Sequence, residues 1–446
     1  MKARKVRNWE DLLLAIFFCA LVLLYLTGPS WGAEIEKTER SADSVLTLAE
    51  CLAIAEANHP DLDGADAQKA IERGRLKQTG VADRVEVAGT VAANRTGSDG
   101  NGENASYSAG ATASVKVFDA NRTKYAIDAQ RKTLSSTEES GQQTLLSVRT
   151  GVKTAYMDLL LDLAVRNQRN ESVDAFKRHL EQARGFYEAG SKPRFDVTKA
   201  EVDLGNAELA LVEAESDIEI ARAALLNAMG VAESQPFEVE AVHWDIPQGT
   251  EQQAEELALL HRSDYKAAEL NTLSGRATLR SEARYASPSV SLKSGYSTDG
   301  DDLFALETGW NVGLSVNIPL IDGGATKSRV EIAEGQIKAL EATQEALRQN
   351  ILLEVRKAVL NVKNARERIR ITELTVTQAE ENYELAEGRY ETGVGSALEI
   401  TDALLSLTDA RLSAYQARYD LQTALISLEK ATGMEQSLQP QLASTF

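Results

Sequence analysis

The sequence contains two copies of one pattern, separated by a fixed spacing of 203 residues. At this spacing Asp119 recurs as Asp322, and the motif Tyr-Glu-x-Gly that starts at Tyr187 starts again at Tyr390. A period of this length far exceeds the roughly 20–50 residues of a solenoid repeat. We therefore expect two copies of one large structural unit, each with the same order of elements.

The N-terminal segment has the layout of a secretory signal peptide. Basic residues precede an apolar run at 12–26, and a small-x-small stretch follows it. We expect residues 1–33 to be removed on export, and an uncleaved membrane anchor is the alternative, because the apolar run is near the short limit for spanning. Cys19 lacks the small residues that a lipoprotein signal places before its cysteine, so no lipid anchor is expected. Only Cys51 would then remain, which excludes an intrachain disulfide.

Charge and residue spacing argue against several classes of function. The chain carries a net charge of −19, and residues 1–33 hold four basic and two acidic side chains, so the remainder carries −21. This acidity argues against nucleic acid as a partner. The four histidines show no metal-ligand spacing, and neither a phosphate-binding glycine loop nor a catalytic Ser/His/Asp order stands out. We expect no enzymatic activity, no cofactor and no metal site.

Proline, glycine and hydrophobic patterning divide both copies in the same way. The predicted boundaries are 34–230 for the first repeat, 231–253 for a linker, 254–433 for the second repeat and 434–446 for a C-terminal tail. After a helical region, the first repeat is expected to contain a β-hairpin at 84–118, a long helix at 120–189 and a returning helix at 194–229. After its own helical region, the second is expected to contain a β-hairpin at 287–320, a long helix at 322–391 and a returning helix at 397–432.

The predicted hairpins rest on strict alternation of apolar and polar residues. The clearest strand places five apolar side chains on one face, namely Trp310, Val312, Leu314, Val316 and Ile318. Period-two patterning over about ten residues is typical of a strand with one apolar face. We expect that face to contact lipid, with Trp310 near the membrane boundary. The polar, glycine-rich stretches at 96–102 and 297–302 are expected to be loops in water.

The two long helices are predicted from proline-free segments rich in Ala, Leu, Glu, Gln, Lys and Arg. A helix of about 70 residues would extend for about 105 Å, which implies coiled-coil-like packing. Asp119 stands just before the first of these helices and Asp322 begins the second, and both side chains suit an N-cap. Glycine-containing turns at 189–193 and 392–396 end them.

Four strands per chain cannot form a stable sheet in lipid by themselves. An open sheet leaves unpaired backbone groups at both edges, and lipid offers these groups no hydrogen bonds. Known single-chain barrels need at least about eight strands. If the strands meet lipid, several chains must therefore pool them. The alternative is a small soluble sheet on a coiled-coil stalk.

Two motifs resemble those of the TolC-like outer-membrane efflux channels. The sequence Ile-Pro-Leu-Ile-Asp-Gly-Gly at 318–324 resembles the strand-to-helix junction of that family. The motif Tyr-Glu-x-Gly at 390–393, followed by Leu-Glu-Ile-x-Asp-Ala at 398–403, resembles its turn and returning helix. Their counterparts in the first copy lie at 187–190 and 195–200. The resemblance covers essentially the whole chain after the signal segment, including the duplication.

The resemblance implies an α+β membrane protein, a homotrimer whose 12-stranded β-barrel, with four strands per chain, is continuous with a long α-helical barrel of coiled-coil helices. It implies the outer membrane of a Gram-negative bacterium, with a long periplasmic extension. The expected partners are outer-membrane lipid, a periplasmic adaptor (a membrane fusion protein) and an inner-membrane pump. The expected function is passive conduction of drugs, metals or proteins to the exterior, in efflux or type I secretion. The alternative from another class is a periplasmic coiled-coil adaptor or scaffold protein without a pore, for which two equivalent hairpins have no evident use.

Acidic residues after the second turn are candidates for a selectivity site at the periplasmic aperture. Glu399 and Asp402 are three positions apart and share one helix face, which Asp409 continues seven residues on. In a trimer these carboxylates would surround one constriction, favour cations and repel anions. The alternative is an ordinary solvated helix face.

The resemblance also implies a lock that holds the aperture closed. It places Tyr390 and Asp196 at the positions of a locking hydrogen bond, and Gly395 where a basic locking residue can occur. Arg194 and Lys199 of the other copy are the candidates to replace that basic residue. The glycines of the turns are expected to contact the adaptor; they are Gly190, Gly393 and Gly395.

Overall fold

The structure, a computed structural model, describes residues 45–98, 101–232, 237–242, 250–302 and 305–434. All of them belong to one compact unit, Val45–Phe446. The expected signal peptide at 1–33, with Cys19, and the expected tail beyond residue 434 lie outside the described residues. No helix in the described parts of the chain has both the length and the low polarity that crossing a membrane requires.

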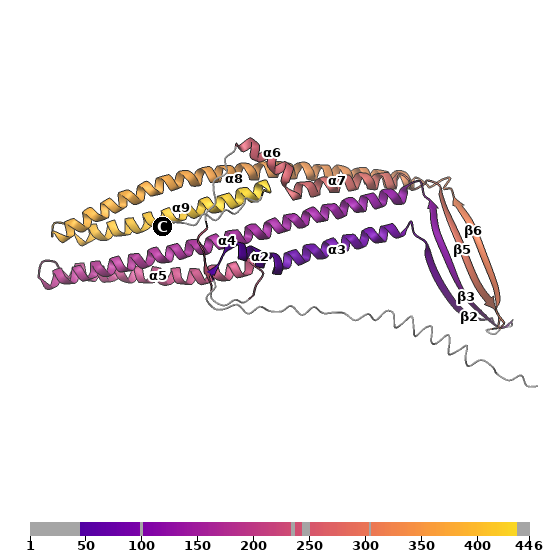
Figure 1. Cartoon of the computed structure of the whole chain (residues 1–446), viewed down its shortest axis with the longest axis horizontal. Helices are drawn as coiled ribbons and strands as arrows, with labels where there is room; N and C mark the ends of the chain where they lie inside the picture. Colours follow the sequence, from indigo (N-terminus) through magenta and orange to yellow (C-terminus); the bar gives the residue numbers. More distant parts are fainter. Residues whose placement is uncertain (1–44, 99–100, 233–236, 243–249, 303–304, 435–446) are drawn as a thin grey trace, which may run out of the picture. The chain divides into compact units, whose positions relative to one another are not determined.

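The same series of elements occurs twice along the chain (Figure 1). The first series is α2 (Leu48–Asn58), α3 (Pro60–Val81), β2 (Glu86–Ser98), β3 (Asn101–Phe118), α4 (Arg122–Glu188) and α5 (Arg194–Ala228). The second is α6 (Glu251–His261), α7 (Ser263–Glu282), β5 (Ser289–Gly300), β6 (Glu307–Asn317), α8 (Ala325–Glu391) and α9 (Ala397–Thr432). Each element of the first series thus has a counterpart in the second, and α4 and α8 both contain 67 residues.

The four long strands form one antiparallel sheet in the order β2-β3-β5-β6. The two repeats meet where β3 pairs with β5, with Val115 opposite Leu292. The predicted apolar face of β6 is exposed in the single chain, at Trp310, Val312, Leu314 and Val316. Ile318 follows β6 and is not part of it, because the next residue, Pro319, has no N–H to donate to a partner strand. Among the described residues, β2 and β6 each pair with a neighbouring strand on one side only.

Both long helices begin two or three residues later than the sequence predicted. Ala120 and Asn121 precede α4 with φ angles of 57° and 66°, and Gly323 and Gly324 precede α8 with φ angles of 62° and 89°. These left-handed conformations are incompatible with a right-handed helix. They allow the chain to change direction between the last strand and the long helix of each repeat.

The aspartates at these junctions precede the left-handed residues and cap the helices that follow. Asp119 Oδ2 accepts a hydrogen bond from the Thr123 amide at 2.9 Å, and Asp322 Oδ2 accepts one from the Thr326 amide at 2.9 Å. The Thr326 hydroxyl first, and then the amides of Thr326 and Gly324, hold the pKa of Asp322 below its ordinary value. The backbone amides of Thr123 and Thr326 therefore make equivalent bonds in the two repeats.

Each predicted helical region consists of two helices, separated by His59 in the first repeat and by Arg262 in the second. The returning helices end against these breaks. A Cβ on Gly230 would lie 2.8 Å from the backbone oxygen of Asn58, and a Cβ on Gly433 would lie 3.1 Å from Arg262 Cα. Only glycine fits at the end of each returning helix.

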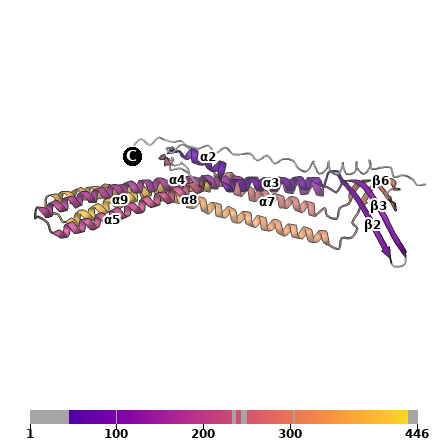
Figure 2. The same cartoon turned by 90° about the horizontal axis from the view of Figure 1, so that it is seen from below.

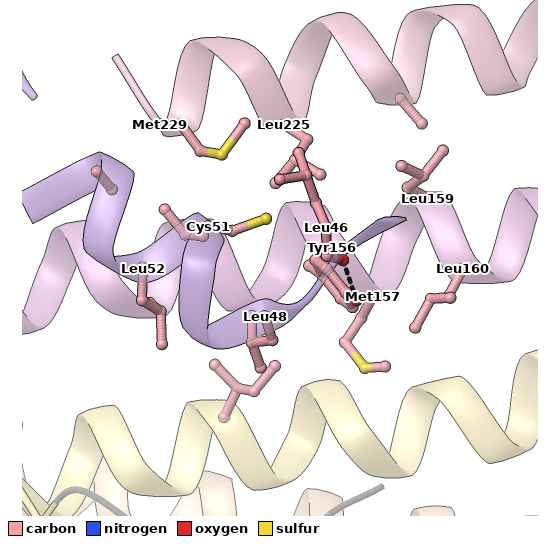
Figure 3. Packing of buried hydrophobic residues seen from close by; sticks show 14 of the residues in the cluster. Leu46, Leu48, Cys51, Leu52, Tyr156, Met157, Leu159, Leu160, Leu225 and Met229 are labelled. Atoms are coloured by element: carbon pink, nitrogen blue, oxygen red, sulfur yellow. Dashed lines mark hydrogen bonds between the residues drawn. The ribbon is translucent and has the colours of Figure 1, made fainter. Parts of the chain in front are cut away.

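A hydrophobic cluster packs α2 against α4 and the end of α5 (Figure 3). Its buried side chains include Leu48, Cys51, Leu52, Tyr156, Met157, Leu225 and Met229. Tyr156 Oη lies 3.1 Å from the carbonyl oxygen of Leu46 and 2.7 Å from that of Glu240, next to the parallel pair β1 (Val45–Leu46) and β4 (Glu238–Val239). β4 lies within the predicted linker 231–253. Burial raises the pKa of the Cys51 thiol to about 11.

A buried ion pair also joins the two repeats. Lys153 Nζ of α4 lies 2.6 Å from Glu429 Oε1 of α9, and these side chains are 0 % and 3 % exposed. Removing one member of such a pair leaves the other charge buried and is strongly destabilising. The pair therefore holds α9 against α4 in one position.

Candidate functional site

The residues predicted to form the aperture lie where two helical hairpins reverse direction. The first hairpin is α4–α5 with its turn at 189–193, and the second hairpin is α8–α9 with its turn at 392–396. Gly190 and Gly393 adopt φ angles of 72° and 76° just after the long helices. Figures 1 and 2 show both turns at the same end of the helices, and α9 packs on α4. Contacts between the hairpins are therefore contacts between the two repeats.

Lys192 connects the two turns directly. Its Nζ donates a hydrogen bond to the Gly395 carbonyl oxygen at 2.9 Å and lies 5.2 Å from the centre of the Tyr390 ring. A side chain at Gly395 has no room, since a Cβ there would lie 2.9 Å from the Tyr390 nitrogen. Lys192 and Gly395 are themselves 203 residues apart. Equivalent positions of the two repeats thus meet at this contact.

The two basic residues predicted to replace a cation at Gly395 are placed differently. Arg194 is exposed at the start of α5, and the described residues include no ion pair that involves it. Lys199 forms an ion pair with Asp203 on the same helix. Lys192 was not among the predicted lock residues, although the repeat spacing itself aligns this lysine with Gly395.

Asp203 provides a second link between the hairpins. One of its carboxylate oxygens is paired with Lys199, and the other accepts a hydrogen bond from Thr401 Oγ1 of α9 at 3.2 Å. Asp203 and Thr401 are both buried. The sequence did not single out this link, because Asp203 lies outside the motifs of the turn.

Tyr390 is completely buried between the hairpins, at 0 % exposure. Its ring lies 5.2 Å from that of His179 and 5.4 Å, edge-on, from that of Phe186. Burial, and after it the nearby Asp196 carboxylate, raise the pKa of Tyr390. Tyr390 Oη has no hydrogen-bond partner among the described residues. The predicted bond between Tyr390 and Asp196 is therefore not made within this single chain.

The three acidic candidates, Glu399, Asp402 and Asp409, are all exposed on α9. Glu399 accepts a hydrogen bond from Arg389 Nε at 3.2 Å, so one carboxylate of the predicted aperture is already paired with a cation. The described residues contain no group of three His, Cys, Asp or Glu side chains arranged to hold a metal ion. The candidate site therefore consists of charged and hydrogen-bonded side chains where the first and second hairpins meet.

Comparison with known proteins identifies the family. A model of the outer membrane efflux protein family matches residues 52–231 and 255–434. The chain belongs to this family. The cation efflux system protein CusC of Escherichia coli K12 is 25 % identical over 276 residues, which cover 57 % of this chain and 56 % of that protein. The match therefore spans little more than half the length of this relative.

Solved structures of outer-membrane proteins share the fold. CusC superposes with a TM-score of 0.80 at 21 % identity, covering 91 % of this chain and 99 % of that one. VceC of Vibrio cholerae superposes with a TM-score of 0.76 at 19 % identity, covering 87 % of this chain and 96 % of VceC. The open state of the MtrE channel of Neisseria gonorrhoeae superposes with a TM-score of 0.72 at 22 % identity, covering 87 % of this chain and 89 % of MtrE.

These matches confirm the predicted fold class, that of trimeric channels in which a β-barrel is continuous with an α-helical barrel, with an internal two-fold repeat. They also confirm the predicted outer-membrane localisation. The family and the fold are those of channels rather than enzymes, and they favour the channel over the adaptor or scaffold alternative.

The substitution Lys192→Met is expected to loosen the contact between the turns, because it removes a hydrogen bond worth about 1 kcal/mol and a cation–π contact worth about 0.5–1 kcal/mol. Spin labels on cysteines introduced at the exposed Glu188 and Val394 report the distance between the turns by pulsed electron paramagnetic resonance. Labelled protomers are diluted with unlabelled ones, so that only distances within one chain are measured. The endogenous Cys51 is fully buried and does not compete for the label.

We expect a broader distribution of distances in Lys192→Met than in the wild type. The matched control is Lys177→Met, which removes an exposed lysine of α4 and should leave the distribution unchanged. An unchanged distribution in Lys192→Met would show that Lys192 does not tie the turns together.

Proposed function

We propose that three copies of the chain assemble into a channel across the outer membrane, which serves a tripartite efflux or type I secretion system. The channel passively conducts substrates that an inner-membrane pump and a periplasmic adaptor deliver to it. The observation that carries this proposal is the pair of one-sided strands, β2 and β6, on a sheet with exposed apolar side chains. Backbone groups at such edges need partners in lipid, and strands of neighbouring chains supply them.

The adaptor is proposed to dock at the two turns. The turn glycines Gly190 and Gly393 are exposed there, and Gly395 beside them accepts the hydrogen bond from Lys192. Apolar side chains lie exposed beside them, at Phe195, Val394 and Leu398. Exposed apolar groups at the end of a hairpin favour contact with another protein.

The aperture is proposed to favour cations. Asp402 and Asp409 are exposed carboxylates on α9, and the chain is strongly acidic overall. A ring of carboxylates at a constriction attracts cations and excludes anions. The relative CusC is described as a cation efflux system protein, which agrees with this preference.

The channel itself is tested by isolation and electrical recording. The protein is expected to remain with the outer membrane on fractionation, to require detergent for release, and to behave as a trimer under chemical crosslinking. In planar lipid bilayers the trimer should give discrete conductance steps. A monomeric protein that leaves with the soluble periplasm would contradict the proposal.

Neutralising the acidic residues of the aperture is expected to reduce its preference for cations. Glu399→Gln combined with Asp402→Asn should lower the permeability of K⁺ relative to Cl⁻ by roughly two- to five-fold. The reversal potential across a KCl gradient measures this ratio. Glu331→Gln removes an exposed carboxylate of α8 and is the matched control. A reversal potential that does not move in the double variant would place selectivity elsewhere.

We propose that Tyr390 Oη and Asp196, which are not bonded to each other in the single chain, form the locking hydrogen bond in the closed trimer. Tyr390→Phe combined with Asp196→Ala removes this bond, which is worth about 1 kcal/mol. The double variant is therefore expected to have a higher single-channel conductance. The repeat supplies the control, since Tyr187→Phe changes the equivalent tyrosine, which is 45 % exposed. Equal conductance in all three proteins would reject this lock.

A further inference from the structure

His179 lies at the interface between the two hairpins and is only 3 % exposed. Neither of its ring nitrogens has a hydrogen-bond partner among the described residues, and the same is true of the neighbouring Tyr390 Oη. Along α4, His179 stands between Phe176 and Leu180, which both belong to buried apolar clusters. Three polar atoms are therefore buried together at the point where the repeats meet, without the bonds that usually offset such burial.

Charged groups approach His179 from the elements packed around it. The charged and titratable groups are Asp196, Lys199 and Asp203 of α5 and Tyr390 of α8, whose ring also faces Lys192 of the first turn. The contribution of α9 is Thr401, which is bound to Asp203. Because Lys199 and Thr401 already occupy the two oxygens of Asp203, this carboxylate is not available to compensate a new positive charge fully.

The surroundings of His179 favour the neutral ring. Burial lowers the pKa of His179, the carboxylates of Asp203 and Asp196 oppose this shift only in part, and the Lys199 ammonium adds to it. The imidazole is therefore neutral at neutral pH. When the hairpins separate, water reaches the ring and its pKa returns toward the ordinary value for histidine.

The states with packed and with separated hairpins differ in the affinity of His179 for a proton. The separated state binds the proton more tightly, so the contact between the hairpins is at full strength above the ordinary pKa of histidine. It weakens as the pH falls below that value and approaches the lower pKa of the packed state. Protonation of His179 thus favours separation of the hairpins.

We propose that His179 makes the contact between the first and second hairpins sensitive to acid, so that the aperture loosens when its surroundings acidify. As a statement about the aperture, this rests on the proposed channel function. The other two histidines in the described residues are placed differently. His59 Nδ1 accepts a hydrogen bond from the Asp61 amide at 3.2 Å, and His261 is exposed at the end of α6.

Conductance tests the response of the aperture. Wild type, His179→Gln and the matched control His261→Gln are recorded in planar lipid bilayers between about pH 7.5 and about pH 5.5. We expect the wild type and His261→Gln to become more conductive on acidification, by roughly two- to five-fold, as the population shifts toward separated hairpins. His179→Gln keeps a polar side chain that does not titrate and should show no such increase. If His179→Gln does not assemble, His179→Phe replaces it, since a phenyl ring suits the apolar surroundings.

A distance measurement tests the same inference without relying on conduction. With the spin labels at Glu188→Cys and Val394→Cys in diluted protomers, the distance between the turns should lengthen at acidic pH in the wild type and stay constant in His179→Gln. If no sample conducts while the wild-type distance still responds to acid, the channel function fails and the acid response of the contact stands. An acid response of equal size in His179→Gln, or a wild-type distance that does not change with pH, would overturn the proposal.

Discussion

The structure depends on one requirement of the polypeptide backbone, namely that a strand edge in lipid must find a hydrogen-bonding partner. Within the chain this requirement is met where β3 pairs with β5, at the boundary between the two repeats. By the spacing of the repeats, β6 corresponds to β3 and β2 corresponds to β5. Pairing of β6 in one protomer with β2 in the next would therefore reproduce, between chains, the contact that the chain already makes within itself.

The helices have the same relation between repeats as the strands, but with different side chains at equivalent positions. α4 packs on α9 within the chain, and the equivalent contact between chains would join α8 to α5. At the turns two pairs of equivalent residues differ in charge, since Lys192 corresponds to Gly395 and Lys199 to Asp402, whereas Asp196 and Glu399 are both acidic. The contact within the chain therefore uses two lysines where its counterpart offers a glycine and an aspartate.

The long elements could be predicted because their signals extend over many residues. Alternation identifies β6, the absence of proline identifies α4 and α8, and Asp119 and Asp322 mark the junctions. The pair β1 and β4 could not be predicted, because strands of two residues cannot show a period. Parts of the candidate site could not be predicted from the sequence either. Tyr187 and Tyr390 share one motif, and only the packing of the second hairpin on the first buries one and exposes the other.

The buried polar groups at the contact between the repeats differ in whether they have hydrogen-bond partners. Near the hydrophobic cluster, Lys153 is paired with Glu429 and Tyr156 Oη contacts two carbonyl oxygens. Near the turns, the ring nitrogens of His179 and the hydroxyl of Tyr390 lack partners within the described residues. Separating a satisfied network costs its hydrogen bonds, whereas an unsatisfied group gains bonds to water when it is exposed. The contact beside His179 is therefore expected to separate more readily than the contact beside the Lys153–Glu429 pair.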